Sequence, residues 1–282
     1  MPSNGLSLVG FMSDRDQALR HLRTQCVPVE DTDQALDAEW QSAQALKGAP
    51  VNRAGQPNFG TLPATHAQYV AAFSTIPWFI ANQALGLAGL TFEWIEIDKL
   101  LAFQFVVDTD RSHHHCASLS SPPTDDELFK MCLPHQLPQE AWAEVVTENS
   151  LIIRSKNTGV HTIARGLFPA GDHTAAGIIF GSSLALVHVV RLNGRCYLHN
   201  GFHRVYGARM AGATHVPCVF RDVADAKEAA ITPPQTFDLA LMESADPPAL
   251  EHFSSGRALQ IQIRAANRFL HVSWAEYVMP IE

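Results

Sequence analysis

The sequence predicts an α+β fold, because helical and strand-like patterns of apolar residues occupy different parts of the chain. Residues 13–47 place apolar side chains at helical spacing, whereas residues 191–222 change from strand to helix and back to strand. Residues 258–280 alternate apolar and polar side chains, which is typical of a pair of strands around residues 265–267.

The chain has 282 residues, 46% of them hydrophobic, which is enough for one large domain or two small ones. We expect a helical N-terminal extension and linker in residues 1–60 and the core in residues 61–230. A helical insertion is expected at about residues 110–175 of that core, and a C-terminal β extension in residues 231–282.

The first part of the chain is predicted to be helical. Asp14 is an N-terminal signal for a helical pattern that continues to residue 47 with an interruption around Pro28. Residues 48–60 are rich in Gly, Pro and Asn and are predicted to form a loop. Residues 65–90 are predicted to form two helices.

The middle of the chain is predicted to mix all three kinds of structure. The expected elements are a strand at 103–107, a loop at 112–121, a helix at 125–131, a helix at 139–146, a strand-like stretch at 150–163 and a glycine-rich connection at 164–181.

A hairpin is predicted next, because Asn193-Gly194 is a two-residue turn signal between strand-like residues 184–191 and 195–199. The segment then continues as a helix from 202, a helix stop at Gly212 and an apolar strand at 214–220.

The turn that precedes this helix is a candidate anion site. Asn200-Gly201 interrupts the strand, and Gly201 would allow the backbone to approach a ligand closely. His203 and Arg204 lie in the first helical turn, where free N–H groups and the helix dipole favour a phosphate.

These residues resemble the ParB/sulfiredoxin-like superfamily. The chain reads GFHR and then AGATHVPCV, similar to the family's Gly-x-x-Arg turn and its AGxxxVPxxV strand. Residues 94–100 are similar to the family's opening strand, and Phe103-Gln104 follows where many members place a polar residue at the pocket. The resemblance covers residues 93–222 and implies that Gly201, His203 and Arg204 contact nucleotide phosphates.

The superfamily contains CTP- and DNA-binding partition proteins, ATP-using sulfiredoxins, serine kinases, nucleases and ADP-ribosyltransferases. The arginine-rich box and helix-turn-helix of partition proteins have no counterpart in GFHRVYGA or after Asp222. Phe202 stands where sulfiredoxins have their catalytic cysteine. The DGHHR box of serine-kinase-like members is closer to NGFHR, although Asn200 replaces the acid.

Further candidates surround the turn. Ser182 and Ser183 form a second possible anion loop before the hairpin, and a simple strand-entry turn explains them equally well. His199 ends the strand beside the glycine turn. Asp108 and Asp110 could supply a base or a metal ligand for phosphoryl transfer, whereas a solvated turn is the structural alternative.

The run His113-His114-His115 suggests a metal site, but adjacent side chains of an extended segment point apart. We therefore expect a solvated loop without structural zinc. Any Mg²⁺ is expected to arrive with the nucleotide and to depend on Asp108 or Asp110.

Composition restricts the partners. The formal net charge is −8, and the longest basic cluster is residues 20–23, so sequence-specific duplex DNA binding is disfavoured. The five cysteines form no CxxC pair, and no signal-peptide pattern is present at the N-terminus, so we expect a cytoplasmic protein. The apolar stretch 76–90 is interrupted by Asn82-Gln83 and is too short to span a membrane.

The sequence therefore predicts a protein that binds a nucleotide (ATP, ADP or CTP), with or without Mg²⁺, as a kinase or other transferase. The alternative is a non-catalytic nucleotide-sensing or interaction module of a bacterial conflict system, with the N- and C-terminal extensions docking a protein partner. A nuclease is a third possibility, which the acidic composition disfavours.

Overall fold

A computed structural model of the chain shows a mixed α+β protein that divides into two compact units. One unit comprises Met1–His135 and Ala185–Ala265, and the other comprises Gln136–Leu184 and Ala266–Glu282. The structure describes residues 2–28, 30–48, 57–60, 66–74, 90–134, 141–155, 160–182, 186–229, 231, 236–264 and 268–275.

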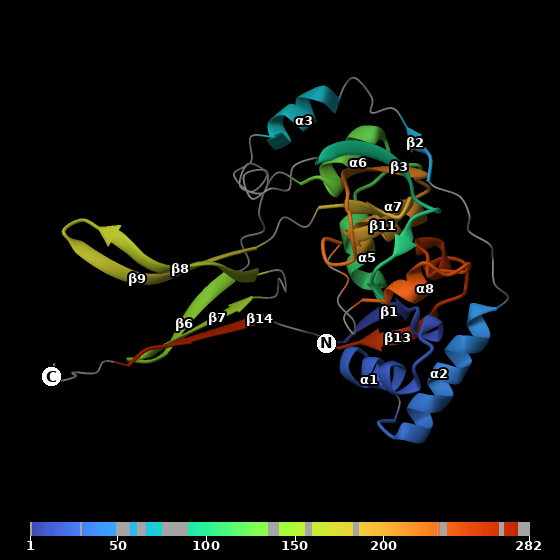
Figure 1. Ribbon diagram of the computed structural model, residues 1–282, viewed down its shortest axis with the longest axis horizontal. Helices are drawn as coiled ribbons and strands as arrows, with labels where there is room; N and C mark the ends of the chain where they lie inside the picture. Colours follow the sequence, from blue (N-terminus) through green and yellow to red (C-terminus); the bar gives the residue numbers. More distant parts are fainter. Residues whose placement is uncertain are drawn as a thin grey trace. The chain divides into compact units, whose positions relative to one another are not determined.

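The first unit builds its core around two sheets flanked by helices (Figure 1). Its elements in chain order are β1 (Ser3–Ser7), η1 (Val9–Phe11), α1 (Arg15–Gln25), α2 (Asp33–Lys47), β2 (Phe59–Gly60), α3 (Ala67–Ser74), β3 (Thr91–Glu96), β4 (Leu101–Ala102), β5 (Val106–Asp108), α5 (Thr109–Cys116), α6 (Asp125–Cys132), β10 (His188–Leu192), β11 (Arg195–Asn200), α7 (Phe202–Met210), β12 (His215–Asp222), α8 (Leu239–Met242), η3 (Leu250–Phe253) and β13 (Leu259–Ile263).

The larger sheet has the strand order β2-β3-β12-β10-β11-β4. Strand β10 runs parallel to β12 and antiparallel to β11, and the β10–β11 turn has positive φ at both Asn193 (50°) and Gly194 (76°). Positive φ at both central residues is the geometry of a type I′ hairpin, so the predicted hairpin is confirmed. The predicted helix and the strand after it are also confirmed as α7 and β12, with Gly212 at φ 99° after the helix.

The smaller sheet of this unit has the order β13-β1-β5, with β1 antiparallel to both neighbours. Helices α1 and α2 lie beside it (Figure 1) and bury Leu22 and Leu36 completely. Both helices were predicted, and the Asp14 side chain caps α1 by accepting a hydrogen bond from the Gln17 N–H at 3.0 Å. The strand that follows η3 near the C-terminus therefore completes a sheet that begins at Ser3.

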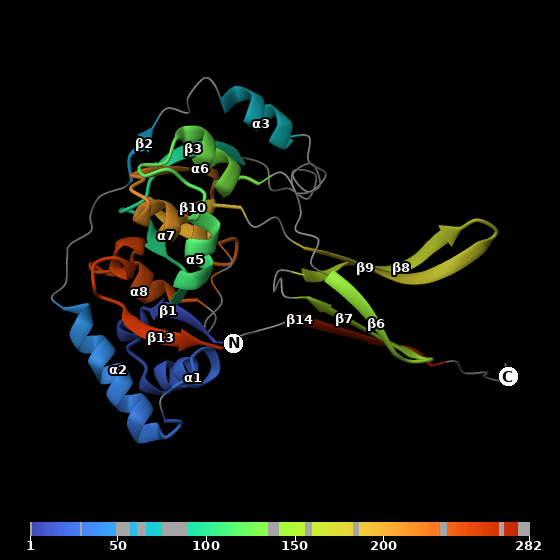
Figure 2. The same cartoon turned by 180° about the vertical axis from the view of Figure 1, so that it is seen from behind.

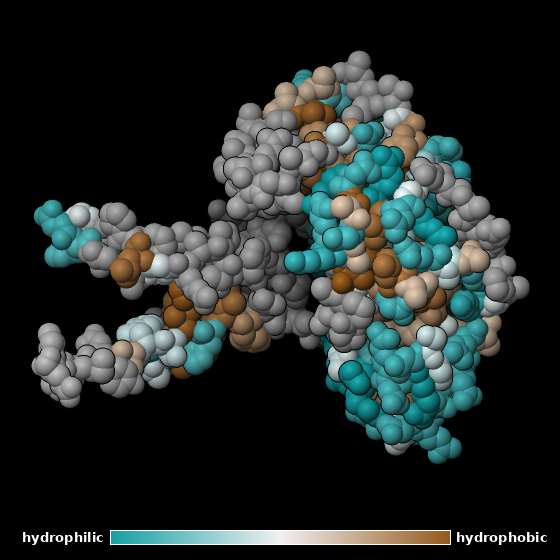
Figure 3. All heavy atoms as spheres, in the orientation of Figure 1, coloured by the Kyte–Doolittle hydropathy of each residue, from teal (hydrophilic) through white to brown (hydrophobic). Residues whose placement is uncertain are grey.

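The second unit consists of a three-stranded sheet and a separate hairpin. The sheet has the order β14-β7-β6, and its hydrophobic side chains are partly visible at the surface (Figure 3). The Val146 and Phe269 side chains are half exposed. Its elements are β6 (Ala141–Thr147), β7 (Ser150–Ser155), β8 (Val160–Ala170), β9 (His173–Ser182) and β14 (Arg268–Ser273).

Four local predictions were wrong. The expected loop at 112–121 begins with helix α5, because the Asp108 carboxylate caps it by accepting from the Arg111 N–H at 2.8 Å. The expected helix at 139–146 is strand β6, which pairs with β7, and the connection at 164–181 is most of the β8–β9 hairpin. The strands predicted within 258–280 exist, but β13 pairs with β1 and β14 pairs with β7.

The expected helical insertion is helical only in its first part. It contains helices α5 and α6 and continues as strands β6 to β9. Helix α6 begins at Asp125, as predicted, and Thr124 and Glu127 form a capping box at its start. Of the two helices expected at 65–90, one is α3, and residues 75–89 lie outside the described part. No helix in the described ranges has both the length and the apolar character to cross a bilayer.

Candidate anion-binding site

The Asn200–Arg204 turn connects β11 to α7, and Gly201 is its conformationally demanding residue. Gly201 has φ 93° and ψ 18°, a left-handed conformation that L side chains rarely adopt. A Cβ at this position would lie 2.8 Å from Val187 Cα and 3.1 Å from Leu186 O. Glycine is therefore required here because the chain's own backbone passes close to it. The sequence analysis predicted that a ligand would make this close approach.

His203 lies in the first turn of α7 and contacts β5. Its Nδ1 accepts a hydrogen bond from the backbone N–H of Asp108 at 3.2 Å. Burial, reinforced by the nearby Arg111 guanidinium, lowers the pKa of His203 to about 4. A neutral imidazole whose Nδ1 is an acceptor carries its proton on Nε2, so His203 presents an N–H donor on its other side.

Helices α5 and α7 lie side by side (Figure 2) and together carry what we call the α5–α7 cluster: Arg111, His115, His203 and Arg204. His115 has its pKa lowered to about 4, first by burial and then by the charges of Arg204 and Arg111. The same two arginines oppose protonation of His203. The four side chains are therefore close enough to act on one another, with two guanidinium groups and two neutral imidazoles in one place.

Arg204 is the most buried cation of the cluster. Burial lowers the pKa of its guanidinium, and the thiols of Cys132 and Cys116 lie within range of its charge. Burial also raises the pKa of Cys116 to about 11 in spite of that arginine. Both thiols are therefore protonated at neutral pH and are poor nucleophiles.

The two acids predicted to serve the site have structural partners. The Asp108 carboxylate caps α5 and accepts a hydrogen bond from Ser3 Oγ at 2.8 Å. Asp110 accepts hydrogen bonds from the backbone N–H of Asn4 at 2.8 Å and from its side chain, and these bonds lower the Asp110 pKa. Asp108 thus lies beside His203 through its backbone, whereas the Asp110 carboxylate contacts β1.

His199 and Asn200 also have partners within the fold. The His199 ring packs edge-on against Phe103 and His188, with ring centroids 5.3 and 5.0 Å away. Burial lowers the pKa of His199, with a further contribution from Arg221. The Asn200 side chain accepts the Gly201 N–H at 2.8 Å and so stabilises the turn.

Three predicted pocket residues lie elsewhere or outside the described part. Ser182 is the last residue of β9 in the second unit, and Ser183 lies outside the described residues. Gln104, which the family resemblance places at a pocket, lines a cavity of about 350 Å³ beside α1 together with Arg20 and Thr24.

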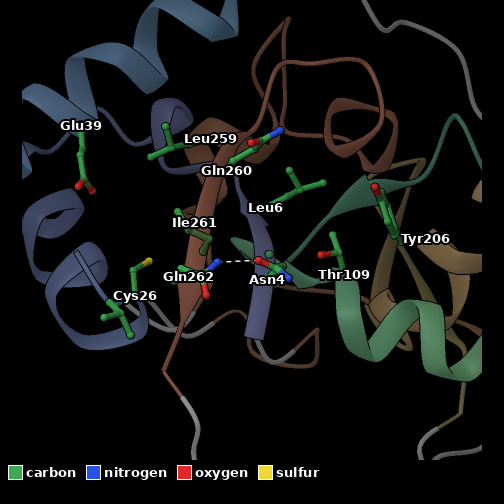
Figure 4. A pocket seen from close by; sticks show the side chains of 12 residues that line it. Asn4, Leu6, Cys26, Glu39, Thr109, Tyr206, Leu259, Gln260, Ile261 and Gln262 are labelled. Carbon is green, nitrogen blue, oxygen red and sulfur yellow. Dashed lines mark hydrogen bonds between the residues drawn. The ribbon is translucent and has the colours of Figure 1, made fainter. Parts of the chain in front are cut away.

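A larger cavity, of about 600 Å³, lies at strand β13 (Figure 4). Asn4, Gln260 and Gln262 contribute carboxamides to its wall, and Tyr206 of α7 reaches it from the side of the α5–α7 cluster. Volumes of 300–1,000 Å³ are typical of small-molecule sites. No sequence pattern indicated this cavity, because its wall is assembled from segments that lie far apart in the sequence.

Sequence reasoning did not indicate His115 as a member of the α5–α7 cluster. Arg111 and His115 are four residues apart and share one face of α5, but they were expected in or next to a loop. The capping signal of Asp108 could have revealed the helix.

Comparisons of the chain with protein-family models, curated proteins and solved structures gave no match.

Proposed function

We propose that the protein binds a nucleotide or another phosphorylated small molecule at the α5–α7 cluster. The supporting observation is that α5 packs against α7 and brings two arginines and two histidines together, where the arginine charges lower the pKa values of both histidines. Helix N-termini favour anions through their N–H groups and dipole. The family resemblance of the GFHR turn points to two of these residues, His203 and Arg204.

In this proposal the arginines supply charge and the histidines supply directed donors. Arg111 is exposed and available to a phosphate, and Arg204 supports the site from a more buried position. His203 donates from Nε2, because its Nδ1 is held by the Asp108 N–H. A bound phosphate would raise the pKa of both histidines from about 4, so binding should strengthen as the pH falls towards 4.

Substitution of the arginines tests the proposal. Arg111→Ala removes a charge-assisted contact and should weaken binding of the preferred ligand by about 2 kcal/mol, roughly thirtyfold. Arg204→Lys keeps the charge but loses the planar fork and should weaken binding by a smaller factor. Calorimetry with ATP, ADP, CTP, GTP and inorganic phosphate, each with and without Mg²⁺, measures the effect.

The matched control is Arg20→Ala, an exposed helical arginine on α1 that lies outside the cluster. It removes the same charge and should leave the affinity within about twofold. Equal losses of affinity in Arg111→Ala and Arg20→Ala would mean that binding depends on the net charge of the protein and not on a contact with Arg111. If none of the five ligands binds the wild-type protein, the proposal is wrong.

A second function, a protein-interaction module, is favoured by the exposed apolar side chains of the second unit. Leu167 on β8 is 73% exposed, and Phe269 and Trp274 at β14 are 58% and 50% exposed. Contiguous exposed apolar patches are typical of protein contact surfaces, and these three side chains would contribute to such a surface. Binding of nucleotide at the first unit and of a protein at the second would combine both proposals.

A further inference from the structure

In the wall of the cavity at β13, the Asp110 carboxylate fixes the orientation of the Asn4 side-chain amide. Asp110, which only accepts hydrogen bonds when ionised, receives the Asn4 Nδ2 group at 3.1 Å. The Asn4 Oδ1 must therefore face the opposite way, where it accepts from Gln262 Nε2 at 2.6 Å. Figure 4 shows the hydrogen bond from Gln262 to Asn4, which uses an amide N–H of Gln262 and leaves its Oε1 as an acceptor.

Glu39 brings a negative charge to the same cavity. It projects from α2 and is the one charged side chain among the described residues that line the wall (Figure 4). Within the described part of the chain it makes no hydrogen bond and has no cation within 4.0 Å. Its charge acts on the cavity-lining Cys26, whose pKa is raised to about 12 by burial and then by Glu39.

A half-buried carboxylate that has no cationic partner among the described residues favours a ligand that brings a positive charge. The Gln262 acceptor offers a further hydrogen bond to an N–H group. Leu6 and Ile261 supply apolar surface for a short aliphatic stem. A phosphate would meet Glu39 as a like charge, so this cavity differs in chemistry from the α5–α7 cluster.

We propose that the β13 cavity binds a small organic cation, an aliphatic amine or guanidine, with Glu39 as its counter-ion and Gln262 as a hydrogen-bond acceptor. The assignment is independent of nucleotide binding, because the two sites use different side chains and opposite charge.

Binding of matched probes to the full chain tests this assignment. Agmatine and butylamine supply the cation, 1-butanol is the neutral isostere of butylamine, and butyrate supplies the opposite charge. Calorimetry at low salt should show that butylamine binds at least tenfold more tightly than butanol, with no binding of butyrate. Glu39→Gln should reduce agmatine affinity about tenfold, or about 1.4 kcal/mol, and Glu39→Asp should retain part of it.

Glu30→Gln is the control, because Glu30 is an exposed acid that does not line the cavity and its substitution changes the net charge equally. It should leave agmatine affinity within about twofold. Gln262→Met removes the acceptor and should weaken agmatine binding more than butylamine binding, since the guanidine has more donors. Agmatine binding that is equal in Glu39→Gln and wild type, or absent at about 10 mM, overturns the proposal.

Discussion

Gly201 shows how the backbone packing beside a candidate site can require one particular residue. Its left-handed backbone conformation connects the end of β11 to the start of α7. The absence of a side chain lets the Leu186–Val187 backbone pass at contact distance. The sequence correctly predicted a turn at Gly201 and a helix that begins after it, because both depend on local backbone preference. It could not show which backbone passes the glycine, because that contact depends on packing.

Gly201→Ala should destabilise the protein by roughly 2–4 kcal/mol, because it combines left-handed strain with overlap against a backbone atom. Gly256 is the matched control: its φ is 78°, and no atom lies within 4 Å of an added Cβ. Gly256→Ala should cost only about 1 kcal/mol. Urea unfolding curves measure both, and equal midpoints would show that the Val187 contact has no energetic role.

At the scale of elements, the pairing of α5 with α7 assembles the candidate site. Gly207 of α7 is buried against α5, and a Cβ there would overlap Cys116 Sγ and approach Ser112 O at 2.9 Å. The two helices can therefore approach closely at this point. Their separation determines whether Arg111 and His115 lie near His203.

Gly207→Ala should separate α5 from α7 and weaken nucleotide or phosphate binding at least threefold, with a loss of stability of roughly 1–3 kcal/mol. The double variant Gly207→Ala/Cys116→Ala removes the overlapping sulfur and should recover much of both losses. Calorimetry and urea unfolding of the single and double variants provide the measurement. Additive losses would mean that the two side-chain positions do not interact.

Elements with local signals were predictable, and elements defined by distant partners were not. Asp14 and Asn193-Gly194 determine their helix start and turn through contacts within a few residues. Strand β6 has a sequence compatible with a helix, and only its pairing with β7 makes it a strand. For the same reason His203 and Arg204 could be named as candidate residues from the sequence, whereas His115 required knowledge of α5.

At the scale of the whole molecule, several histidines are kept neutral by burial. The pKa of His188 is lowered to about 3, and those of His21, His115 and His203 are lowered to about 4. Their folded-state pKa values are below the ordinary value of 6.5, so the unfolded chain binds protons first as the pH falls. Their contribution to stability is complete above about pH 6.5 and is lost towards pH 4.

We therefore expect the urea midpoint to fall between pH 7 and pH 5, the range in which the unfolded histidines become charged. His21→Gln should reduce this pH dependence, because His21 is buried next to Ser7 and Phe105. His113→Gln, at an exposed position on α5, should leave it unchanged. Midpoints that do not vary over this pH range would contradict neutral burial of these histidines.

The position of β1 between β13 and β5 also determines when the first unit can be completed during synthesis. Strand β1 emerges from the ribosome before its neighbour β13, which ends at Ile263. At about 5–20 residues per second, β1 would wait roughly ten seconds to a minute for that partner. Residues 136–184, which belong to the second unit, are translated within this interval. A chain released before β13 would therefore expose one edge of β1, a surface open to pairing with other chains.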